Sequence, residues 1–417
     1  MNYDLCIIGA GWAGFNAALK AARLGKKVCI VDDKEIGGTC LNRGCIPTKA
    51  FVYHSKTGLK LPEILKKRDE VVLRLRDGML YLVKSNKVDY FKARALIKKD
   101  GSVFIGDGNT IKPKFILIAT GSVAKELPNL KIDHNKVISS DDALALTEIP
   151  DKLLIVGAGA IGCEFASIFK RLGSSVAITD IASQLLPGID NQVAKKLQTA
   201  FQKSGISVSL NNSNDLNIGD YDKVLLSVGR APVSSGIWED GVDINLERGA
   251  ISADFELRTS RRGVFAAGDC ISGYMLAHVA AYEGELAVNN MFSRPIKRDY
   301  TVTPSSVFCS PEISSIGLSE AEAKNFGADF KAVVVHFLSV GMAHIHDDTQ
   351  GFVKVIFEKR SGRILGASII GLEASELINS FSILMRNKIT ASGMRNTIFA
   401  HPSISEILGE VARSFEQ

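Results

Sequence analysis

Cysteine, net charge and long apolar runs are all scarce in this sequence, and each scarcity excludes a class of protein. The seven cysteines among 417 residues are too few, and odd in number, for a secreted disulfide framework, so we expect a reducing compartment. The net charge of +5 is small and comes without the clustered basic face typical of nucleic-acid-binding proteins. No run approaches the roughly 18 apolar residues of a membrane-spanning helix. We therefore expect no nucleic-acid partner and no membrane association.

The first residues lack the features of a targeting segment. Residues 1–4 carry no basic leader and no small-residue cleavage site, and they pass directly into the strand-like residues 5–8. We therefore expect no signal peptide and a cytoplasmic protein, or one of the mitochondrial matrix if a presequence has been removed. The length predicts about two to four domains.

An internal repeat is the strongest feature that is present. Residues 5–14 (LCIIGAGWAG) recur as residues 153–162 (LLIVGAGAIG), and both copies continue in register to an acid, Asp32 and Asp180. Each copy has the order strand, glycine turn, helix and strand of a βαβ unit. A glycine-rich turn without a ligand is the alternative, but two matching copies favour two dinucleotide sites.

The glycines and acids of the repeat have separate expected roles. The first glycine permits a tight turn, the second lets a pyrophosphate approach the backbone, and the third lets helix and strand pack closely. These glycines are Gly9, Gly11 and Gly14 in the first copy, and Gly157, Gly159 and Gly162 in the second. The acids accept hydrogen bonds from ribose hydroxyls. Two such sites imply FAD and a nicotinamide dinucleotide, and the absence of an arginine just after Asp180 favours NAD over NADP.

Three further strand-like runs end in candidate cofactor contacts. The run at residues 115–118 is followed by Thr120 and Gly121. The run at residues 224–227 is followed by Gly229, and the run at residues 263–267 is followed by Asp269. An acid at the carboxyl end of a parallel strand points into the ligand crevice, so Asp269 is a candidate ligand for a ribityl hydroxyl. Beyond residue 301 the pattern changes. Strand-like residues 305–308, 352–357 and 363–370 alternate with helix-like residues 319–325, 375–387 and 403–413, which predicts a separate α+β domain.

Two cysteines lie five positions apart just after the first βαβ unit. Cys40 and Cys45 could be zinc ligands, although no second Cys or His pair is near, or unrelated buried thiols. In a straight helix their Cα atoms would be about 8–9 Å apart, whereas a disulfide needs less than about 7 Å. A bridge therefore requires a distorted backbone, which Gly44 allows. We favour a reducible dithiol/disulfide centre beside a flavin.

The segment that holds these cysteines resembles a known family. Residues 37–49 (GGTCLNRGCIPTK) are similar to the active-site segment of the flavoprotein pyridine nucleotide-disulfide oxidoreductases (class I), and are most similar to the dihydrolipoamide dehydrogenases among them. The resemblance covers nearly the whole chain. Its further motifs are residues 119–122, 228–230, 268–269, 276–278, 283–284 and 401–406.

The resemblance implies a fold and a domain order. The fold class is α/β, with two Rossmann-like dinucleotide-binding domains plus a C-terminal α+β dimerisation domain. Residues 1–139 would be the FAD-binding domain, 140–255 the NAD-binding domain, 256–296 a return segment of the FAD domain, and 297–417 the interface domain. The chain is shorter than is usual in the family near residues 50–62 and 209–221, where a polar linker spans residues 211–217.

The resemblance also implies residue roles. Cys40 would exchange with the substrate dithiol, and Cys45 would be the thiolate under the flavin. Lys49 would lie near flavin N5 and pair with Glu164, and the backbone at Ala277 and His278 would stabilise negative charge on the flavin. His401 would be the base. Its orienting carboxylate would be Glu406, since an acid five residues after a histidine can return to the imidazole Nδ1.

Together these roles imply an FAD-dependent enzyme that oxidises protein-bound dihydrolipoamide with NAD. The expected partners are a second copy of the chain and the lipoyl domain of a 2-oxo acid dehydrogenase acyltransferase or a glycine-cleavage carrier protein. We expect no metal site. The alternatives are a related NAD(P)H-dependent reductase, like glutathione or mercuric reductase, and a non-catalytic flavoprotein scaffold.

Overall fold

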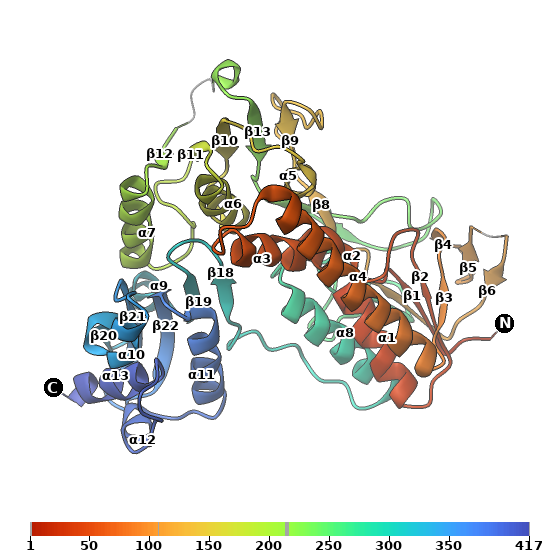
Figure 1. Cartoon of the computed structure of the whole chain (residues 1–417). Helices are drawn as coiled ribbons and strands as arrows, with labels where there is room; N and C mark the ends of the chain where they lie inside the picture. Colours follow the sequence, from red (N-terminus) through yellow and green to blue (C-terminus); the bar gives the residue numbers. More distant parts are fainter. Residues whose placement is uncertain (1, 107, 213–216, 417) are drawn as a thin grey trace. The chain divides into compact units, whose positions relative to one another are not determined.

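The computed structural model describes residues 2–106, 108–212 and 217–416. The chain divides into two compact units. Unit 1 comprises Met1–His54, Pro62–Lys125 and Gly229–Asp299, and unit 2 comprises Ser55–Leu61, Glu126–Val228 and Tyr300–Gln417. The helices and strands of both units are labelled in Figure 1.

Unit 1 is built on a five-stranded parallel sheet. The strand order is β17-β7-β1-β2-β3. The bounds are β1 (Leu5–Ile8), β2 (Val28–Val31), β3 (Asp89–Phe91), β7 (Phe115–Ile118) and β17 (Val264–Ala266). Because Ile8 pairs with both Val31 and Ile118, the carboxyl ends of three strands meet at one edge. The first glycine turn and Asp32 therefore lie along this edge.

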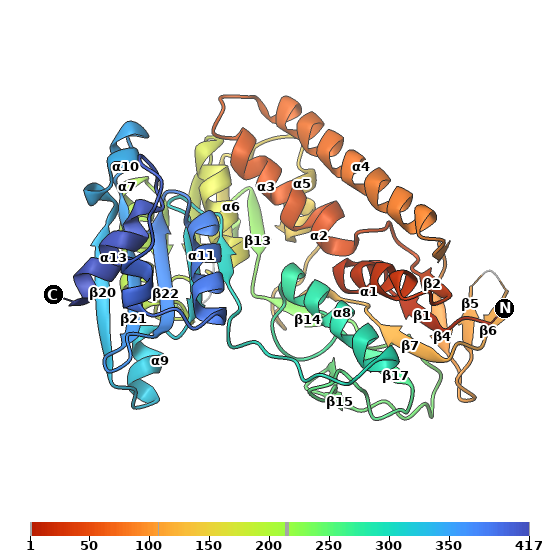
Figure 2. The ribbon, with the colours of Figure 1, turned by 90° about the horizontal axis from the view of Figure 1, so that it is seen from below.

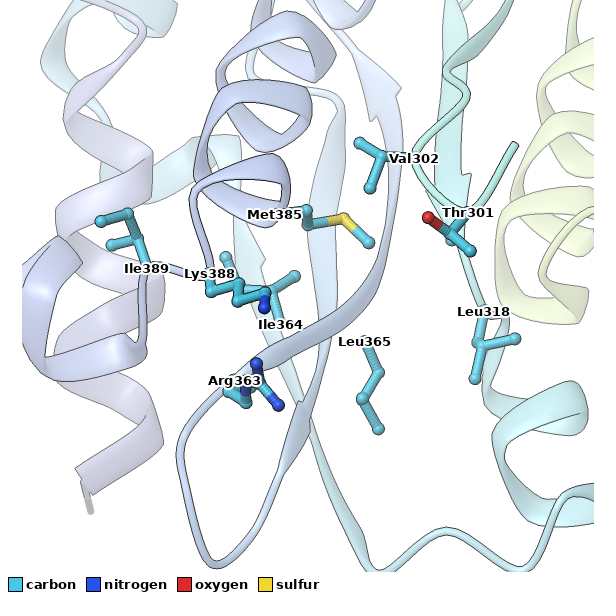
Figure 3. A pocket seen from close by; sticks show the side chains of 10 residues that line it. Thr301, Val302, Leu318, Arg363, Ile364, Leu365, Met385, Lys388 and Ile389 are labelled. Carbon is cyan, nitrogen blue, oxygen red and sulfur yellow. The ribbon is translucent and has the colours of Figure 1, made fainter. Parts of the chain in front are cut away.

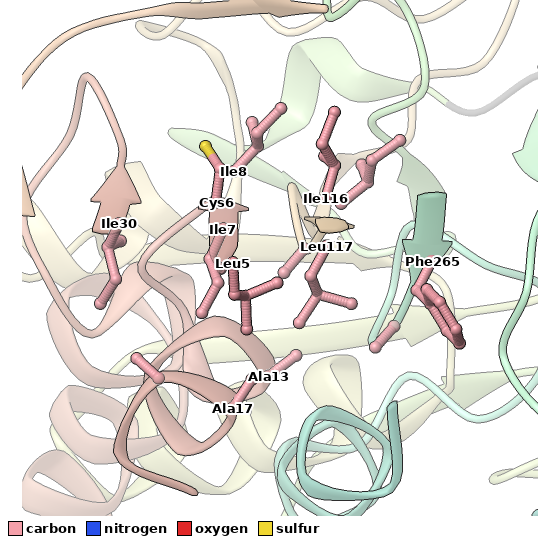
Figure 4. Packing of buried hydrophobic residues seen from close by; sticks show 14 of the residues in the cluster. Leu5, Cys6, Ile7, Ile8, Ala13, Ala17, Ile30, Ile116, Leu117 and Phe265 are labelled. Atoms are coloured by element: carbon pink, nitrogen blue, oxygen red, sulfur yellow. The ribbon is translucent and has the colours of Figure 1, made fainter. Parts of the chain in front are cut away.

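Two helices pack together beside this sheet. They are α1 (Trp12–Arg23) and α8 (Ala277–Phe292), which lie side by side in Figures 1 and 2. In Figure 4, Leu5 and Ile7 point toward α1, whereas Cys6 and Ile8 point to the other face. All four side chains are buried, which explains why β1 is apolar throughout instead of alternating.

The remaining elements of unit 1 surround this sheet. Three helices follow the first βαβ unit, namely α2 (Gly38–Arg43), α3 (Cys45–His54) and α4 (Leu61–Ser85). An antiparallel sheet has the order β4-β5-β6, with bounds Ala95–Ile97, Val103–Ile105 and Thr110–Ile111. Two antiparallel pairs join β8 (Ser122–Ala124) to β14 (Arg230–Pro232) and β15 (Leu246–Glu247) to β16 (Ala250–Ile251).

Unit 2 contains a second five-stranded parallel sheet of the order β12-β11-β10-β13-β9. Its strands are β9 (Val137–Ile138), β10 (Lys152–Val156), β11 (Ser175–Thr179), β12 (Ser207–Ser209) and β13 (Lys223–Leu226). Its helices are α5 (Ser140–Ala145), α6 (Ala160–Arg171) and α7 (Asn191–Lys203), and a short 3-10 turn, η1 (Ile218–Asp220), precedes β13. As in unit 1, the strand before the glycine turn, here β10, lies between two parallel neighbours.

Unit 2 also contains an antiparallel sheet of the order β18-β19-β22-β21-β20. Its strands are β18 (Ser305–Val307), β19 (Ile313–Gly317), β20 (Phe330–His336), β21 (Gly351–Glu358) and β22 (Ile364–Gly371). Its helices are α9 (Glu320–Asn325), α10 (Gly341–Ile345), α11 (Ala374–Arg386), α12 (Ala391–Arg395) and α13 (Glu406–Glu416), with a 3-10 turn, η2 (Phe337–Ser339). Helices α11 and α13 cover one face of the sheet (Figure 2).

A buried ion cluster joins the two sheets of unit 2. The side chain of Lys354 on β21 is 2% exposed, and its Nζ lies 2.8 Å from Asp190 Oδ2 and 2.5 Å from Glu320 Oε2. Asp190 also caps α7 by accepting the Gln192 N–H. Removing one partner would leave an uncompensated buried charge, so this contact holds α7 against the antiparallel sheet.

The predicted fold class is confirmed. Both parallel sheets and the change to an antiparallel sheet beyond residue 301 are present. Unit 1 includes residues 229–255, which we had assigned to the NAD-binding domain, and unit 2 holds the last two predicted domains together. The four-part division therefore stays a prediction. Of the predicted linker, residues 213–216 lie outside the described residues. No helix of the described chain is long and apolar enough to cross a membrane.

Candidate active site

The two glycine turns have the same backbone geometry. Gly9 and Gly157 have φ values of +110° and +107°, a region that favours glycine. A Cβ on Gly9 would lie 2.2 Å from Ala119 O, and one on Gly157 would lie 2.5 Å from Ser227 O. Each turn therefore passes against the end of the neighbouring strand, where a side chain has no room.

The second and third glycines of each turn differ in the space around them. A Cβ on Gly14 or Gly162 would lie 1.9 or 2.0 Å from the carbonyl oxygen of the first glycine. At Gly11 the nearest described atom would be 4.0 Å away, and at Gly159 none lies within 4 Å. The third glycine is thus needed for packing, whereas the second faces open space. This is the arrangement that a pyrophosphate needs.

We expect alanine substitutions to separate these two roles in the second turn. Gly159→Ala should leave the melting temperature unchanged and weaken NADH binding about 10- to 100-fold, since the added methyl group occupies ligand space. Gly162→Ala should instead prevent folding of unit 2, because its Cβ meets backbone. Gly78→Ala is the control, since its Cβ meets nothing within 4 Å on α4. Equal effects of Gly159→Ala and Gly162→Ala on the melting temperature would contradict these roles.

The acids of the repeat make matching hydrogen bonds. Asp32 Oδ2 accepts the Ala10 N–H at 2.7 Å, and Asp180 Oδ2 accepts the Ala158 N–H at 2.6 Å. Each Oδ1 atom accepts from the backbone N–H two residues later in the chain. Asp32 Oδ1 accepts from Lys34 at 2.9 Å, and Asp180 Oδ1 accepts from Ala182 at 2.8 Å. Burial raises the pKa of Asp32 although these N–H groups oppose the rise. Each carboxylate is fixed beside its turn with lone pairs remaining for a ribose diol.

The helices that begin at the predicted cofactor contacts have no side-chain cap. Helices α1, α6 and α8 start after Gly11, Gly159 and Leu276, and none of these residues caps with a side chain. Helices α5, α7, α9 and α12, in contrast, are capped by Ser139, Asp190, Ser319 and Thr390. The N–H groups at the starts of α1 and α6 suit a pyrophosphate, and the backbone at the start of α8, at Ala277 and His278, suits a flavin. The residues present therefore fit the two dinucleotides.

A chain of hydrogen bonds that sequence reasoning missed holds Asp269. Its Oδ2 accepts from Ser122 Oγ at 2.6 Å, and Ser122 Oγ accepts from Arg230 Nε at 2.7 Å. Arg230 Nη2 also donates to Ser122 O at 2.7 Å. Arg230 follows Gly229, which the sequence predicted as a cofactor contact after a strand. This position in the sequence could have indicated that Arg230 belongs to the site. The chain fixes the Asp269 carboxyl group and leaves Oδ1 for a ribityl hydroxyl.

Neighbouring contacts support the same edge of unit 1. Thr120 Oγ1 donates to Val233 O at 2.6 Å, and Gly121 has a φ of +73°. Glu283 of α8 is buried, and its Oε2 accepts the N–H of Gly268 at 2.6 Å, which orders the turn before Asp269. Glu283 is a second contact that the sequence pattern did not predict. Gly229 has a φ of +109°, and its contact with NAD stays a prediction.

The cysteine centre lies at a break between two helices. Helix α2 ends at Arg43, Gly44 has φ −137° and ψ −113°, and α3 begins at Cys45. A Cβ on Gly44 would lie 2.9 Å from Thr39 O. The distortion expected at Gly44 is therefore present, and it removes the spacing that a straight helix would impose on Cys40 and Cys45.

Both cysteines of the centre are thiols in this structure. A hydrogen bond with Cys45 raises the pKa of the Cys40 thiol well above its ordinary value, and burial raises it further. The other five cysteines, Cys6, Cys29, Cys163, Cys270 and Cys309, are buried. The pair is therefore the part of the cysteine set that reagents and substrates reach.

His401 and Glu406 form the contact that their spacing predicts. His401 Nδ1 lies 2.8 Å from Glu406 Oε1, and Glu406 Oε2 accepts the Ser403 N–H at 2.9 Å. The hydrogen bond from Ser403, followed by that with His401, lowers the pKa of Glu406. An ionised carboxylate only accepts, so Nδ1 carries the hydrogen and Nε2 is free of it. The side chain of His401 is 79% exposed, and Nε2 is the atom that can take a proton.

The predicted catalytic residues are divided between the units. Cys40, Cys45 and Lys49 belong to unit 1, whereas Glu164 and His401 belong to unit 2. Glu164 is buried on α6, and its Oε1 accepts the Phe308 N–H at 2.9 Å. The pairing of Lys49 with Glu164 and the catalytic roles stay predictions. None of these residues lines the hollow of unit 2 in Figure 3, which is bordered by Arg363, Met385 and Lys388.

Comparison with known proteins gives a family match over most of the chain. Residues 3–284 match the family described as pyridine nucleotide-disulphide oxidoreductase, and residues 303–412 match its dimerisation domain. Dihydrolipoyl dehydrogenase of Chlamydia muridarum is 34% identical over 98% of this chain and 96% of its own length. Leghemoglobin reductase of Glycine max is also 34% identical, over 98% of this chain and 87% of its own length.

Solved structures agree with this match. The Cu(II) complex of the HOCl-induced flavoprotein disulfide reductase RclA from Escherichia coli has a TM-score of 0.91 and 28% identity, over 98% of this chain and 99% of that one. LpdA from Mycobacterium tuberculosis has the same TM-score at 24% identity over 98% and 99%, a likeness that shows the fold alone. The resemblance inferred from residues 37–49 is confirmed.

Proposed function

The chain belongs to the pyridine nucleotide-disulphide oxidoreductase family, whose members use FAD and NAD(H), and from this premise we propose that it is a dihydrolipoamide dehydrogenase. The reaction oxidises the two thiols of protein-bound dihydrolipoamide to a disulfide and reduces NAD to NADH. The observation that carries the proposal is the hydrogen-bonded thiol pair Cys40/Cys45 at the helix break. The 34% identity to dihydrolipoyl dehydrogenases over nearly the full length supports the choice of substrate.

The thiol pair performs the exchange in two balanced steps. His401 Nε2 takes a proton from one substrate thiol, and the resulting thiolate attacks the Cys40 sulfur of the Cys40–Cys45 disulfide, so that Cys45 leaves with the electron pair. The second substrate thiol then loses its proton, and its thiolate attacks the substrate sulfur bound to Cys40, so that Cys40 leaves as a thiolate. The two protons released by the substrate, one of them held on His401, convert both cysteine thiolates to thiols. The substrate is now a disulfide, and the enzyme holds two more electrons as the thiol pair seen here.

The cofactors supply the rest of the redox chemistry. When bound, FAD would supply the electron transfer between the cysteine pair and NAD. The residues that would hold it are the glycines of the first turn with Asp32, Asp269 and the start of α8. Lys49 would lie near the reactive edge. The second turn and Asp180 would hold NAD.

Asp180 should set the choice between the two nicotinamide cofactors. We expect kcat/KM for NADH to exceed that for NADPH by at least about 100-fold, because a 2′-phosphate would face this carboxylate without a compensating cation. Ile181, the next residue, is 78% exposed and offers none. Steady-state kinetics with both cofactors measures the ratio. Asp180→Ala should lower it chiefly through NADH, and equal kcat/KM values in the parent enzyme would refute the assignment.

The proposal includes partners and a location. The dimerisation domain at residues 303–412 supports a homodimer, and the proposed protein partner is a lipoyl domain of a 2-oxo acid dehydrogenase acyltransferase or a glycine-cleavage carrier protein. The reducing cytoplasm is the proposed location, since the seven cysteines are few and odd in number.

Steady-state turnover with competing substrates tests the function. We expect kcat/KM for lipoamide and a lipoyl domain to exceed that for glutathione disulfide by at least about 100-fold, since a site rejects a substrate that leaves its groups unpaired. Mercuric and cupric ions should support little NADH oxidation. Preference for glutathione disulfide or for a metal ion would replace the proposal by one of the related reductases. No turnover of any of them by the FAD-loaded protein would favour a scaffold.

A further inference from the structure

The indole N–H of Trp12 in unit 1 is a buried donor without a well-aligned acceptor. Its Nε1 is buried and forms no hydrogen bond of good geometry with a described residue. The ring packs edge-on against Phe15, with centroids 6.4 Å apart, so the side chain itself is held in place. A buried N–H without a partner costs free energy, and such groups in folded proteins often have a functional reason.

The backbone beside Trp12 contacts the segment that carries Cys40. The Gly37 N–H donates to Ala10 O at 2.8 Å, and a Cβ on Gly38 would lie 2.8 Å from Gly11 Cα. Trp12 follows Gly11 directly, and Cys40 lies two residues after Gly38. These two contacts place the start of α1 against the start of α2.

The charged and titratable groups described around Cys40 act on it in opposite directions. The hydrogen bond with Cys45 and burial raise the pKa of the Cys40 thiol, and the Cys45 charge adds to this. A hydrogen bond from the Trp12 side chain and the positive charge of Lys49 lower it. Since Nε1 forms no aligned hydrogen bond while Cys40 is a thiol, the N–H remains available for the charged form of the sulfur.

The internal repeat argues that the glycine turn does not itself require a tryptophan. The second copy has the same backbone geometry and carries Ala160 at the matching position. No pair of cysteines follows that copy as Cys40 and Cys45 follow the first. The indole thus occurs in the copy that lies beside the redox centre.

We propose that Trp12 is a catalytic residue that stabilises the Cys40 thiolate by donating its indole N–H to the sulfur. The inference rests on the proposed function, in which Cys40 leaves as a thiolate when the second substrate sulfur attacks the mixed disulfide. The bond between Cys40 and substrate sulfur breaks, the electron pair stays on Cys40, and the indole N–H then donates to the charged sulfur. A charge-assisted hydrogen bond of this kind favours the leaving step.

Alkylation of Cys40 in the FAD-loaded Cys45→Ser protein tests this directly. Iodoacetamide reacts with the thiolate, and the labelled Cys40 peptide is quantified by mass spectrometry across a pH series. Trp12→Phe keeps an aromatic ring but removes the N–H, so it should raise the apparent pKa by about one unit and slow alkylation below that pKa about tenfold. Trp238→Phe, at the other half-buried tryptophan of unit 1, is the matched control and should change neither.

A second measurement covers the case in which Trp12→Phe does not fold. In Trp238→Phe, Trp12 is the single tryptophan, and its fluorescence should titrate with the pKa found by alkylation and lose this titration when Cys40→Ser is added. An unchanged alkylation profile in folded Trp12→Phe, or a Trp12 emission that ignores Cys40, would overturn the inference. Both readouts are independent of lipoamide turnover, so failure of the proposed substrate is recognised separately.

Discussion

Cys40→Ser is expected to abolish lipoamide turnover, by more than about 10³-fold, while the long-wavelength absorption of a thiolate beside oxidised FAD remains. Serine cannot form the mixed disulfide with the substrate, so the exchange stops at its first step. Cys45 keeps its sulfur and still provides the thiolate under the flavin. Cys45→Ser should therefore remove the absorption band, and it should abolish turnover as well. Steady-state assays with lipoamide measure turnover, and absorption spectra of the oxidised variants measure the band.

The electron count in an anaerobic titration with dithionite gives a second readout. The parent protein should consume two two-electron equivalents per flavin, one for FAD and one for the cysteine disulfide, and either serine variant should consume one. Cys29→Ser is the control, because it removes a thiol from a buried pair in the core, where Cys6 and Cys29 are register partners on β1 and β2. Identical absorption spectra for Cys40→Ser and Cys45→Ser would contradict the separate roles.

Mixing two inactive homodimers, Cys40→Ser and His401→Gln, should restore about a quarter of parent activity once subunits exchange. The side chain of His401 is 79% exposed on its own chain and belongs to the region that matches the dimerisation domain. We expect the base to act on the cysteine pair of the other subunit. A mixed dimer then has one site with intact cysteines and intact histidine, and random exchange makes half of the dimers mixed.

Subunit exchange has to be shown independently, by native mass spectrometry of differently tagged chains. His401→Gln mixed with itself is the control and should stay inactive. If mixed dimers form and no lipoamide is turned over, His401 does not act across the interface. Glu406→Gln should weaken the orienting hydrogen bond without removing the base, so its loss of kcat should be smaller than that of His401→Gln.

Much of the fold could be predicted from the pattern of apolar residues and from the internal repeat in the sequence. The two βαβ units could be predicted because their turns use glycines that no other residue replaces, and because their central strands are buried on both faces. The antiparallel strands β4–β6 were not predicted. Their residues mix polar and apolar types without a clean alternation, and packing on unit 1 decides their structure.

The candidate site was predictable only where one short segment carries it. The spacing of Cys40 and Cys45 required a distorted backbone for a disulfide, and Gly44 allowed one. His401 and Glu406 could be paired because they are only five residues apart in the sequence. Ser122, Arg230 and Asp269 could not be joined in advance. They come from three distant segments, and only the pairing of β8 with β14 places Arg230 beside Ser122.

The matching hydrogen bonds of Asp32 and Asp180 mean that the chain uses one recognition device twice. In the proposed function, that device would address adenosine and the pyrophosphate, the portion that FAD and NAD have in common, so it would carry no information about which molecule binds. The identity of the ligand in unit 1 would then be determined at its other end, through Asp269 and α8.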